Sequence, residues 1–233
     1  MATHTNKQQH FSSRTFTFLK ELQANNNKAW FDEHRARYES DVREPALAYI
    51  EAMAVSLRRI SPHFTAIAKR SGGSLMRVHR DMRFARDGKP YKTNIGIQFR
   101  HERGRDVHAP GFYVHVEPGQ CFLGAGIWRP ESGTLAAIRR EIADRPAAWR
   151  RAVTARRFTE KFELSGEQLS RPPRGYSSDS PCIDDLRRKD FIALTPVPES
   201  FVRRRDLPKA SSELFRRATA LMRFLCGALD LDY

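Results

Sequence analysis

Four short β-rich runs in the middle of the chain constrain the fold more than any other feature. They are SLMRVHR (74–80), TNIGIQFR (93–100), GFYVHVE (111–117) and CFLGAGIW (121–128). Turn signals separate them, and EPGQ between the last two is typical of a compact hairpin turn. The runs predict an antiparallel meander between about residues 74 and 128.

The middle runs alternate between apolar and polar residues. In the third run Phe112, Val114 and Val116 face one way, whereas Tyr113, His115 and Glu117 face the other. The second run, 93–100, alternates in the same way. This period of two predicts a sheet with one apolar face and one polar face.

Helical patterns precede the strands. Phe16, Leu19 and Leu22 recur at helical spacing, Asn27 is placed to cap a second helix, and Pro45 suits the first turn of a third. The expected N-terminal part is therefore helical, after a flexible segment at residues 1–12.

Helical patterns also follow the strands. GTLAAIRREIADRPAAWRRAV (133–153) and the stretch from about Lys209 to Leu229 have apolar residues at helical spacing. Between them, CIDDLRRKDFIAL (182–194) predicts a short helix followed by an edge strand. Helices, strands and helices in this order predict an α+β fold, with a central antiparallel sheet flanked by N-terminal and C-terminal helices, in one domain over residues 13–233.

The chain is strongly basic, with a net charge of +14. Residues 68–109 hold 11 Lys or Arg against 4 Asp or Glu, a local charge of +7. Such charge attracts nucleic acid, acidic membranes or phosphorylated ligands, and the alternative is a basic surface that only meets solvent.

The cellular location is predicted from what the sequence lacks. No apolar run approaches the roughly 18–20 residues of a membrane span, and the first residues hold no apolar signal core. Cys121, Cys182 and Cys226 form no CxxC pair, which favours a reducing compartment. We expect a cytoplasmic protein without a membrane partner.

The stretch RVHRDMRFARDGKPYKTN (77–94) is the first candidate site. Asp-Gly and Pro predict a loop in which cations and backbone N–H groups can surround an anion. Arg83, Arg86 and Lys89 are expected to meet the ligand, whereas Arg80 and Asp81 are expected to be mainly architectural. The alternative is an Arg–Asp network that only pins the loop. The candidate anion-binding residues are Arg77, Arg80, Asp81, Arg83, Arg86, Lys89, Tyr91, Lys92, Asn94, His115 and Glu117.

His115 and Glu117 extend this candidate site onto the predicted sheet. A His and a carboxylate two residues apart on a strand could be a general acid–base pair or two metal ligands, or they could simply be solvated. GAGIW (124–128) is not a dinucleotide fingerprint, and the chain contains no Walker A, GxSxG or HExxH sequence. The sequence indicates no cofactor and no metal.

Several segments together resemble a known family. They are FLKELQANNNKAWFDEHRARYE, RVHRDMRFARDGKPYKTNIGIQFR, GFYVHVEPGQCFLGAGIWRPE and RPPRGY. The chain is identified as a member of the domain of unknown function 2461 family, which has an R-x-x-R-D-x-R-F run followed by an acidic residue, a Lys and P-Y. Gly88 stands where that Lys is expected, and Lys89 follows it. The resemblance implies membership and no activity.

Three alternative functions follow from these observations. The first is binding of a phosphate-bearing or other anionic small molecule at the Arg-rich strand–loop site, with or without catalysis. The second is association with nucleic acid through a broad basic surface, and a third alternative is a non-catalytic interaction protein with a structural Arg–Asp network.

Overall fold

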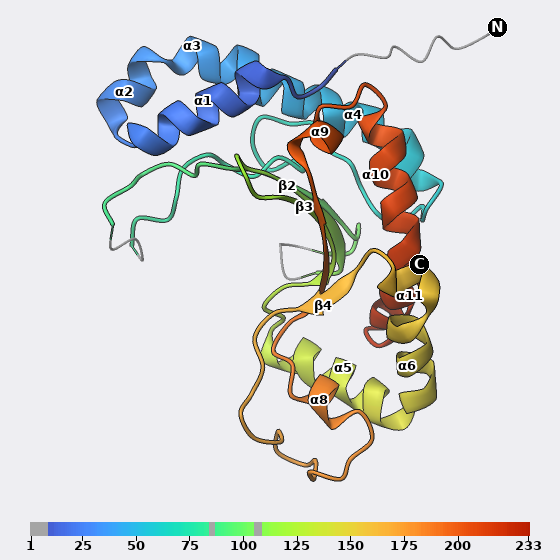
Figure 1. Ribbon diagram of the computed structural model, residues 1–233. Helices are drawn as coiled ribbons and strands as arrows, with labels where there is room; N and C mark the ends of the chain where they lie inside the picture. Colours follow the sequence, from blue (N-terminus) through green and yellow to red (C-terminus); the bar gives the residue numbers. More distant parts are fainter. Residues whose placement is uncertain (1–8, 84–86, 105–108) are drawn as a thin grey trace, which may run out of the picture.

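The centre of the molecule is one antiparallel sheet of five strands in the order β1-β2-β3-β5-β4. It is seen in the computed structural model (Figure 1), which describes residues 9–83, 87–104 and 109–233. Each pair of neighbouring strands is antiparallel. The strands are β1 Ile95–Arg100, β2 Gly111–Val116, β3 Cys121–Ile127, β4 Glu163–Ser165 and β5 Phe191–Val197.

The register of these strands gives the sheet two different faces. Ile97 pairs with Val114, which pairs with Leu123, and all three are buried. The neighbouring positions Gln98, Tyr113 and Gly124 pair in the same way and lie on the opposite face. The predicted alternation of an apolar and a polar face is confirmed for β1 and β2.

Helices at both ends of the chain pack against the apolar face. The elements α4, α10 and α11 contact the sheet, with α10 and α11 against β3 and α4 against β1 (Figure 1). The Tyr49 hydroxyl on α4 donates to the Ser211 hydroxyl on α10 at 2.9 Å, and both side chains are fully buried. The predicted α+β class is therefore confirmed.

The N-terminal helices begin as the sequence predicts. The Asn27 side chain accepts from the backbone N–H of Trp30, and Pro45 lies in the first turn of α4. The elements are α1 Ser13–Ala24, α2 Lys28–Glu33, α3 Arg35–Tyr38, a π-helix at Glu39–Arg43 and α4 Glu44–Arg58.

The C-terminal helices are more divided than the sequence predicts. Pro146 begins a new helix, so residues 133–153 form two helices, and a short 3₁₀ turn interrupts the final helix. The elements are α5 Ser132–Asp144, α6 Pro146–Thr154, α7 Arg156–Thr159, α8 Ile183–Leu186, α9 Glu199–Val202, α10 Leu207–Phe215, the 3₁₀ helix Arg216–Ala218 and α11 Thr219–Gly227. None of the described helices has the length and hydropathy that crossing a bilayer requires.

Two strand predictions need correction. Residues 74–80 are no regular strand: Leu75 forms a single bridge to Ile97 of β1, and His79 forms another to Tyr91, which precedes β1. The strand expected at the sheet edge is β5, and it lies inside the sheet because β4, a short strand that the sequence patterns do not predict, pairs with its outer side.

Buried hydrophobic side chains from α1 to α11 form one cluster, and the single domain over residues 13–233 stays a prediction. The predicted flexible segment at residues 1–12 lies largely outside the described residues. Its last part is packed, since Phe11 is fully buried and His10 nearly so.

A buried carboxylate joins the ends of three strands. Asp190, which is 4% exposed, precedes β5 and accepts the backbone N–H of Arg129 at 2.7 Å and of Glu167 at 3.1 Å. Arg129 follows β3 and Glu167 follows β4. Bonds from a carboxylate to backbone N–H groups are among the stronger hydrogen bonds in proteins, so Asp190 fixes where these strands end.

Two glycines of β3 differ in what a side chain there would meet. At Gly126, φ is +130° and an added Cβ would overlap the carbonyl oxygen of Phe191. At Gly124 an added Cβ would lie 3.2 Å from Leu194 Cδ2, the end of a flexible side chain.

We expect Gly126→Ala to lower the free energy of unfolding by at least about 2 kcal/mol, because it combines backbone strain with a clash against β5. Gly124→Ala should change it by less than about 1 kcal/mol. Urea unfolding measures the loss of stability in each variant. An equal loss in the two variants would contradict this prediction.

Candidate functional site

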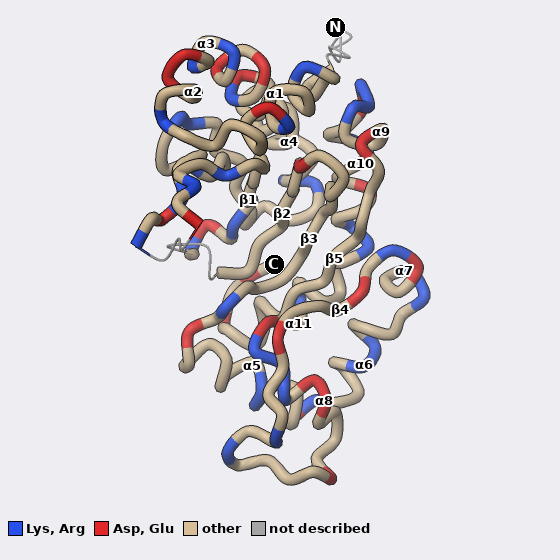
Figure 2. Tube along the Cα trace, turned by 60° about the vertical axis from the view of Figure 1, so that its left-hand side comes forward, with Lys and Arg blue, Asp and Glu red and all other residues tan. Residues whose placement is uncertain are grey.

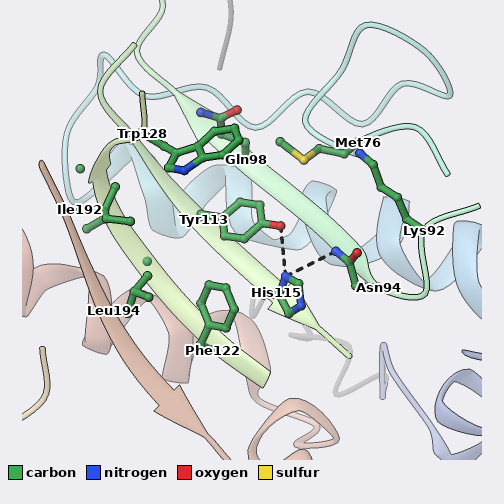
Figure 3. A pocket seen from close by; sticks show the side chains of 14 residues that line it. Met76, Lys92, Asn94, Gln98, Tyr113, His115, Phe122, Trp128, Ile192 and Leu194 are labelled. Carbon is green, nitrogen blue, oxygen red and sulfur yellow. Dashed lines mark hydrogen bonds between the residues drawn. The ribbon is translucent and has the colours of Figure 1, made fainter. Parts of the chain in front are cut away.

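A pocket of about 540 Å³ lies on the polar face of the sheet, opposite the helices α10 and α11 (Figure 3). Strands β1, β2, β3 and β5 all contribute to it, together with the segment that runs beside β1. It is lined by Met76, Lys92, Asn94, Gln98, Gly111, Tyr113, His115, Phe122, Gly124, Ala125, Gly126, Trp128, Ile192 and Leu194.

Glycines leave the space that the pocket occupies. Gly111, Gly124 and Gly126 line it. Gly96 lies beneath its edge, where an added Cβ would come within 2.7 Å of Tyr113 Oη and 2.9 Å of Met76 Sδ. Larger side chains at these positions would fill the hollow or displace the residues around it.

The walls of the pocket are aromatic and aliphatic. Tyr113 and Phe122 rise from the sheet, Trp128 lies at the end of β3 with 47% of its surface exposed, and Ile192 and Leu194 face them from β5 (Figure 3). Such walls suit a flat apolar group, because aromatic rings offer large contact areas in offset or edge-to-face arrangements.

A chain of polar groups runs along one side of the pocket. His115 stacks on Phe122 with ring centroids 4.5 Å apart. Its Nε2 lies 3.0 Å from Glu117 Oε2, and the other carboxylate oxygen of Glu117 accepts the Thr93 hydroxyl at 2.9 Å. On the pocket side, His115 Nδ1 lies 3.2 Å from Tyr113 Oη and 3.4 Å from the amide nitrogen of Asn94 (Figure 3).

These contacts assign the roles of the imidazole nitrogens. An ionised Glu117 can only accept, so Nε2 carries a hydrogen and donates it. Nδ1 is then the acceptor in the neutral ring, and it receives the hydroxyl of Tyr113 and the amide of Asn94. Burial raises the pKa of Tyr113 to about 12, and the charge of Glu117 adds to the effect, so this hydroxyl keeps its proton. His115 therefore has a hydrogen-bonded carboxylate on one side and the pocket on the other.

Lys92 supplies the positive charge at this site. It is half-buried, and it makes no ion pair with any residue that the structure describes. Burial lowers the pKa of its amino group, and repulsion from Arg77 lowers it further. Arg77 is exposed and likewise has no ion-pair partner within residues 9–83, 87–104 and 109–233.

Three other charged candidates, Arg80, Asp81 and Arg83, lie in ion pairs on an exposed loop. Arg80 Nη1 lies 2.7 Å from Asp87 Oδ1 and also donates to the carbonyl of Lys89. Arg83 and Asp81 form a pair with two bonds, of 3.0 and 2.7 Å. Both aspartate pKa values are lowered by their arginine partners, Asp81 to about 2.

The remaining candidates have different surroundings. Tyr91 is buried and stacks on Phe31 with ring centroids 4.0 Å apart, so it belongs to the core. Lys89 is exposed in the loop, and Arg86 lies outside the described residues. Of the predicted site residues, the pocket thus brings together Lys92, Asn94 and His115, with Glu117 behind them.

Sequence reasoning missed most of the pocket lining. Gln98 was on the predicted polar face and could have been included from alternation alone. Gly124 and Gly126 in the GAGIW run indicate close backbone approach or a bulge rather than a ligand site, whereas Ile192 and Leu194 come from a strand more than sixty residues away. In the described part of the chain, no group of three His, Cys, Asp or Glu residues could hold a metal ion.

The fold and site define an α+β protein with an open antiparallel sheet, helices on one face and a small-molecule-sized pocket on the other. The chain belongs to the family described as conserved hypothetical protein (DUF2461), whose model matches residues 14–224. This confirms the predicted membership. Comparison with curated proteins and with solved structures gave no significant match.

Proposed function

We propose that the sheet-face pocket binds a small organic molecule that has a flat apolar body and one anionic group, such as a phosphate, sulfonate or carboxylate. The pocket replaces the Arg-rich loop as the centre of the anion site. Lys92 is the residue of the 77–94 stretch that we assign to the anion, and the nearby charge of Arg77 adds to the positive potential there.

The observation that carries this proposal is the environment of Lys92. Taking an ammonium group out of water is unfavourable unless an opposite charge compensates it. Lys92 is half-buried beside another cation, and no described residue compensates it with a carboxylate. An anionic ligand would supply the missing charge, whereas Arg80 and Arg83 of the loop already pair with aspartates.

The rest of the pocket supports an apolar ligand body. Its volume of about 540 Å³ lies within the range usual for small-molecule sites. A flat group could lie over Gly124 between the aromatic side chains and the aliphatic side chains of β5, while Asn94 and Gln98 offer amide hydrogen bonds.

The proposal extends to acid–base chemistry through His115. Nδ1 faces the pocket, and Glu117 would stabilise the imidazolium if the ring took a proton from a bound molecule. A ligand held by Lys92 would place its body beside this ring. The pocket could therefore serve an enzyme that moves a proton on an anionic substrate.

The direct test replaces Lys92 by Met, which keeps the apolar stem and removes the charge. Naphthyl phosphate and naphthalenesulfonate should bind the unaltered protein and raise its melting temperature, and Lys92→Met should weaken both by roughly ten- to hundredfold, the loss expected for a charged hydrogen bond. Calorimetric titration measures the affinities.

Two controls accompany this variant. The neutral methyl naphthyl sulfone should bind both proteins equally, because it makes no use of the charge. Arg80→Ala should leave the binding of naphthyl phosphate within about twofold, since Arg80 pairs with Asp87. Loss of binding in Arg80→Ala but not in Lys92→Met would show that the anion binds at the Arg-rich loop instead of the pocket. This result would overturn the proposal.

The affinity for naphthalenesulfonate should depend on pH through Lys92. Its pKa lies below the usual 10.5, so the amino group loses its proton at a lower pH than an exposed lysine does. Affinity should be constant at low pH and fall as pH rises through this lowered pKa, whereas the sulfonate stays ionised throughout.

Lys92→Arg provides the matched control, because a guanidinium keeps its charge over this range. Calorimetric titrations at a series of pH values should give the same affinity for naphthalenesulfonate at every pH for this variant. The same fall in Lys92→Arg would assign the pH dependence to another group.

A further inference from the structure

A second concave surface lies at the C-terminal end of the chain and is lined by arginines. Two hollows of about 640 and 620 Å³ adjoin there, and they share Arg157, Arg216 and Arg217. We call them together the arginine groove. Its arginines are Arg145, Arg151, Arg156, Arg157, Arg216, Arg217 and Arg223.

Helices on both sides build the arginine groove. α6 and α7 form one side, and the 3₁₀ helix with α11 forms the other, while α10 contributes its last turn. α6 and α11 pack together, so the two rows of arginines face a common surface. The sheet-face pocket shares no lining residue with it.

The carboxylates of the groove neutralise only part of this charge. Glu141 pairs with Arg145 at 2.9 Å, and Glu160 bridges Arg156 and Arg217 at 2.8 and 3.1 Å. The third carboxylate in the groove, Glu213, pairs with a lysine. Four arginines form no ion pair with any residue in the described part of the chain: Arg151, Arg157, Arg216 and Arg223.

Arg223 lies over the ring of Tyr233, and none of the four guanidinium groups has a carboxylate partner among the described residues. Their charges repel one another, and a bound polyanion would relieve that repulsion. Their spread over several helices and two hollows suits a ligand with repeated charges better than a single phosphate. Arginine is also the cation that grips phosphate oxygens bidentately.

Most of the side chains between the arginines are small, and Phe158, Thr219 and Phe224 lie among them. Ala148, Ala152, Ala155, Ala220 and Gly227 line the first hollow. These residues allow a backbone to approach closely, and they offer no side-chain group that could read a base edge. The groove therefore offers phosphate contacts from its arginines, and apart from the arginines themselves it has few groups that could read a base.

We propose that the arginine groove binds the phosphodiester backbone of nucleic acid, independently of base sequence. The proposal assigns nucleic-acid binding to this one surface rather than to the net positive charge of the whole molecule. Lys and Arg lie on elements from one end of the molecule to the other in Figure 2, so net charge as a whole marks no single face. What distinguishes the groove is that its arginines exceed the carboxylates that could pair with them.

The test compares two double variants that remove the same charge. Arg157→Gln with Arg216→Gln alters the groove, whereas Arg203→Gln with Arg205→Gln alters exposed residues just before α10, away from it. Binding of a short fluorescein-labelled single-stranded oligonucleotide, and of its duplex, is measured by fluorescence anisotropy over a series of salt concentrations.

For the unaltered protein we expect binding at low salt that weakens steeply as salt rises. Contacts with four phosphates of a single strand give a logarithmic slope of about −3. The groove variant should bind at least tenfold more weakly, with a slope shallower by about 1 to 1.5. The control variant should stay within about twofold, and circular dichroism should be the same for both.

Three results would overturn the proposal. They are no binding to either oligonucleotide at low salt, equal losses in the two variants, and full competition by inorganic phosphate at millimolar concentration, which would make the groove a site for a small anion. Lys92→Met should bind the oligonucleotide normally, so failure of the pocket proposal and failure of this one are separable.

Discussion

The sheet can bury only one of its faces, and this constraint organises the rest of the structure. Ile97, Val114 and Leu123 point to the helices, and the register of the strands then sends Gln98, Tyr113 and Gly124 to the other side. No described helix covers that side over β1, β2 and β3, so its residues meet a hollow rather than a core. The pocket is thus a consequence of strand geometry, and only its chemistry is set by the particular side chains.

Sequence patterns predict the position of a side chain correctly when that position depends only on neighbouring residues in the chain. The alternation in β2 places Tyr113 and His115 on one face from the sequence alone, because successive residues of a strand always point to opposite sides. The side chains of β5 could not be assigned to the site in this way. Ile192 lies opposite Gly126 only because distant segments pair, and no short-range pattern determines which strands become neighbours. For the same reason β4 was not predicted, and β5 was wrongly expected at the edge.

The basic stretch at residues 77–94 shows a further limit of sequence reasoning. The composition of the stretch places many cations near one another, but it does not predict which of them form ion pairs with carboxylates. Arg80 and Arg83 meet aspartates because the loop turns back on itself, whereas Lys92 lies beyond the loop at the edge of the pocket. The ion-pair partners of charged residues depend on the path of the chain, so one basic stretch contains both ion-paired residues and a lysine without an ion-pair partner among the described residues.

The glycines beneath the pocket have a consequence for the history of this family. A pocket bounded by large side chains changes shape only when the core is repacked, but a pocket floored by Gly124 can lose volume one carbon at a time while the strand pairing stays the same. Selection for a new ligand could therefore act on this surface through single conservative substitutions. Under the proposed function, the size of the residue at this position would then set the size of the ligand that fits.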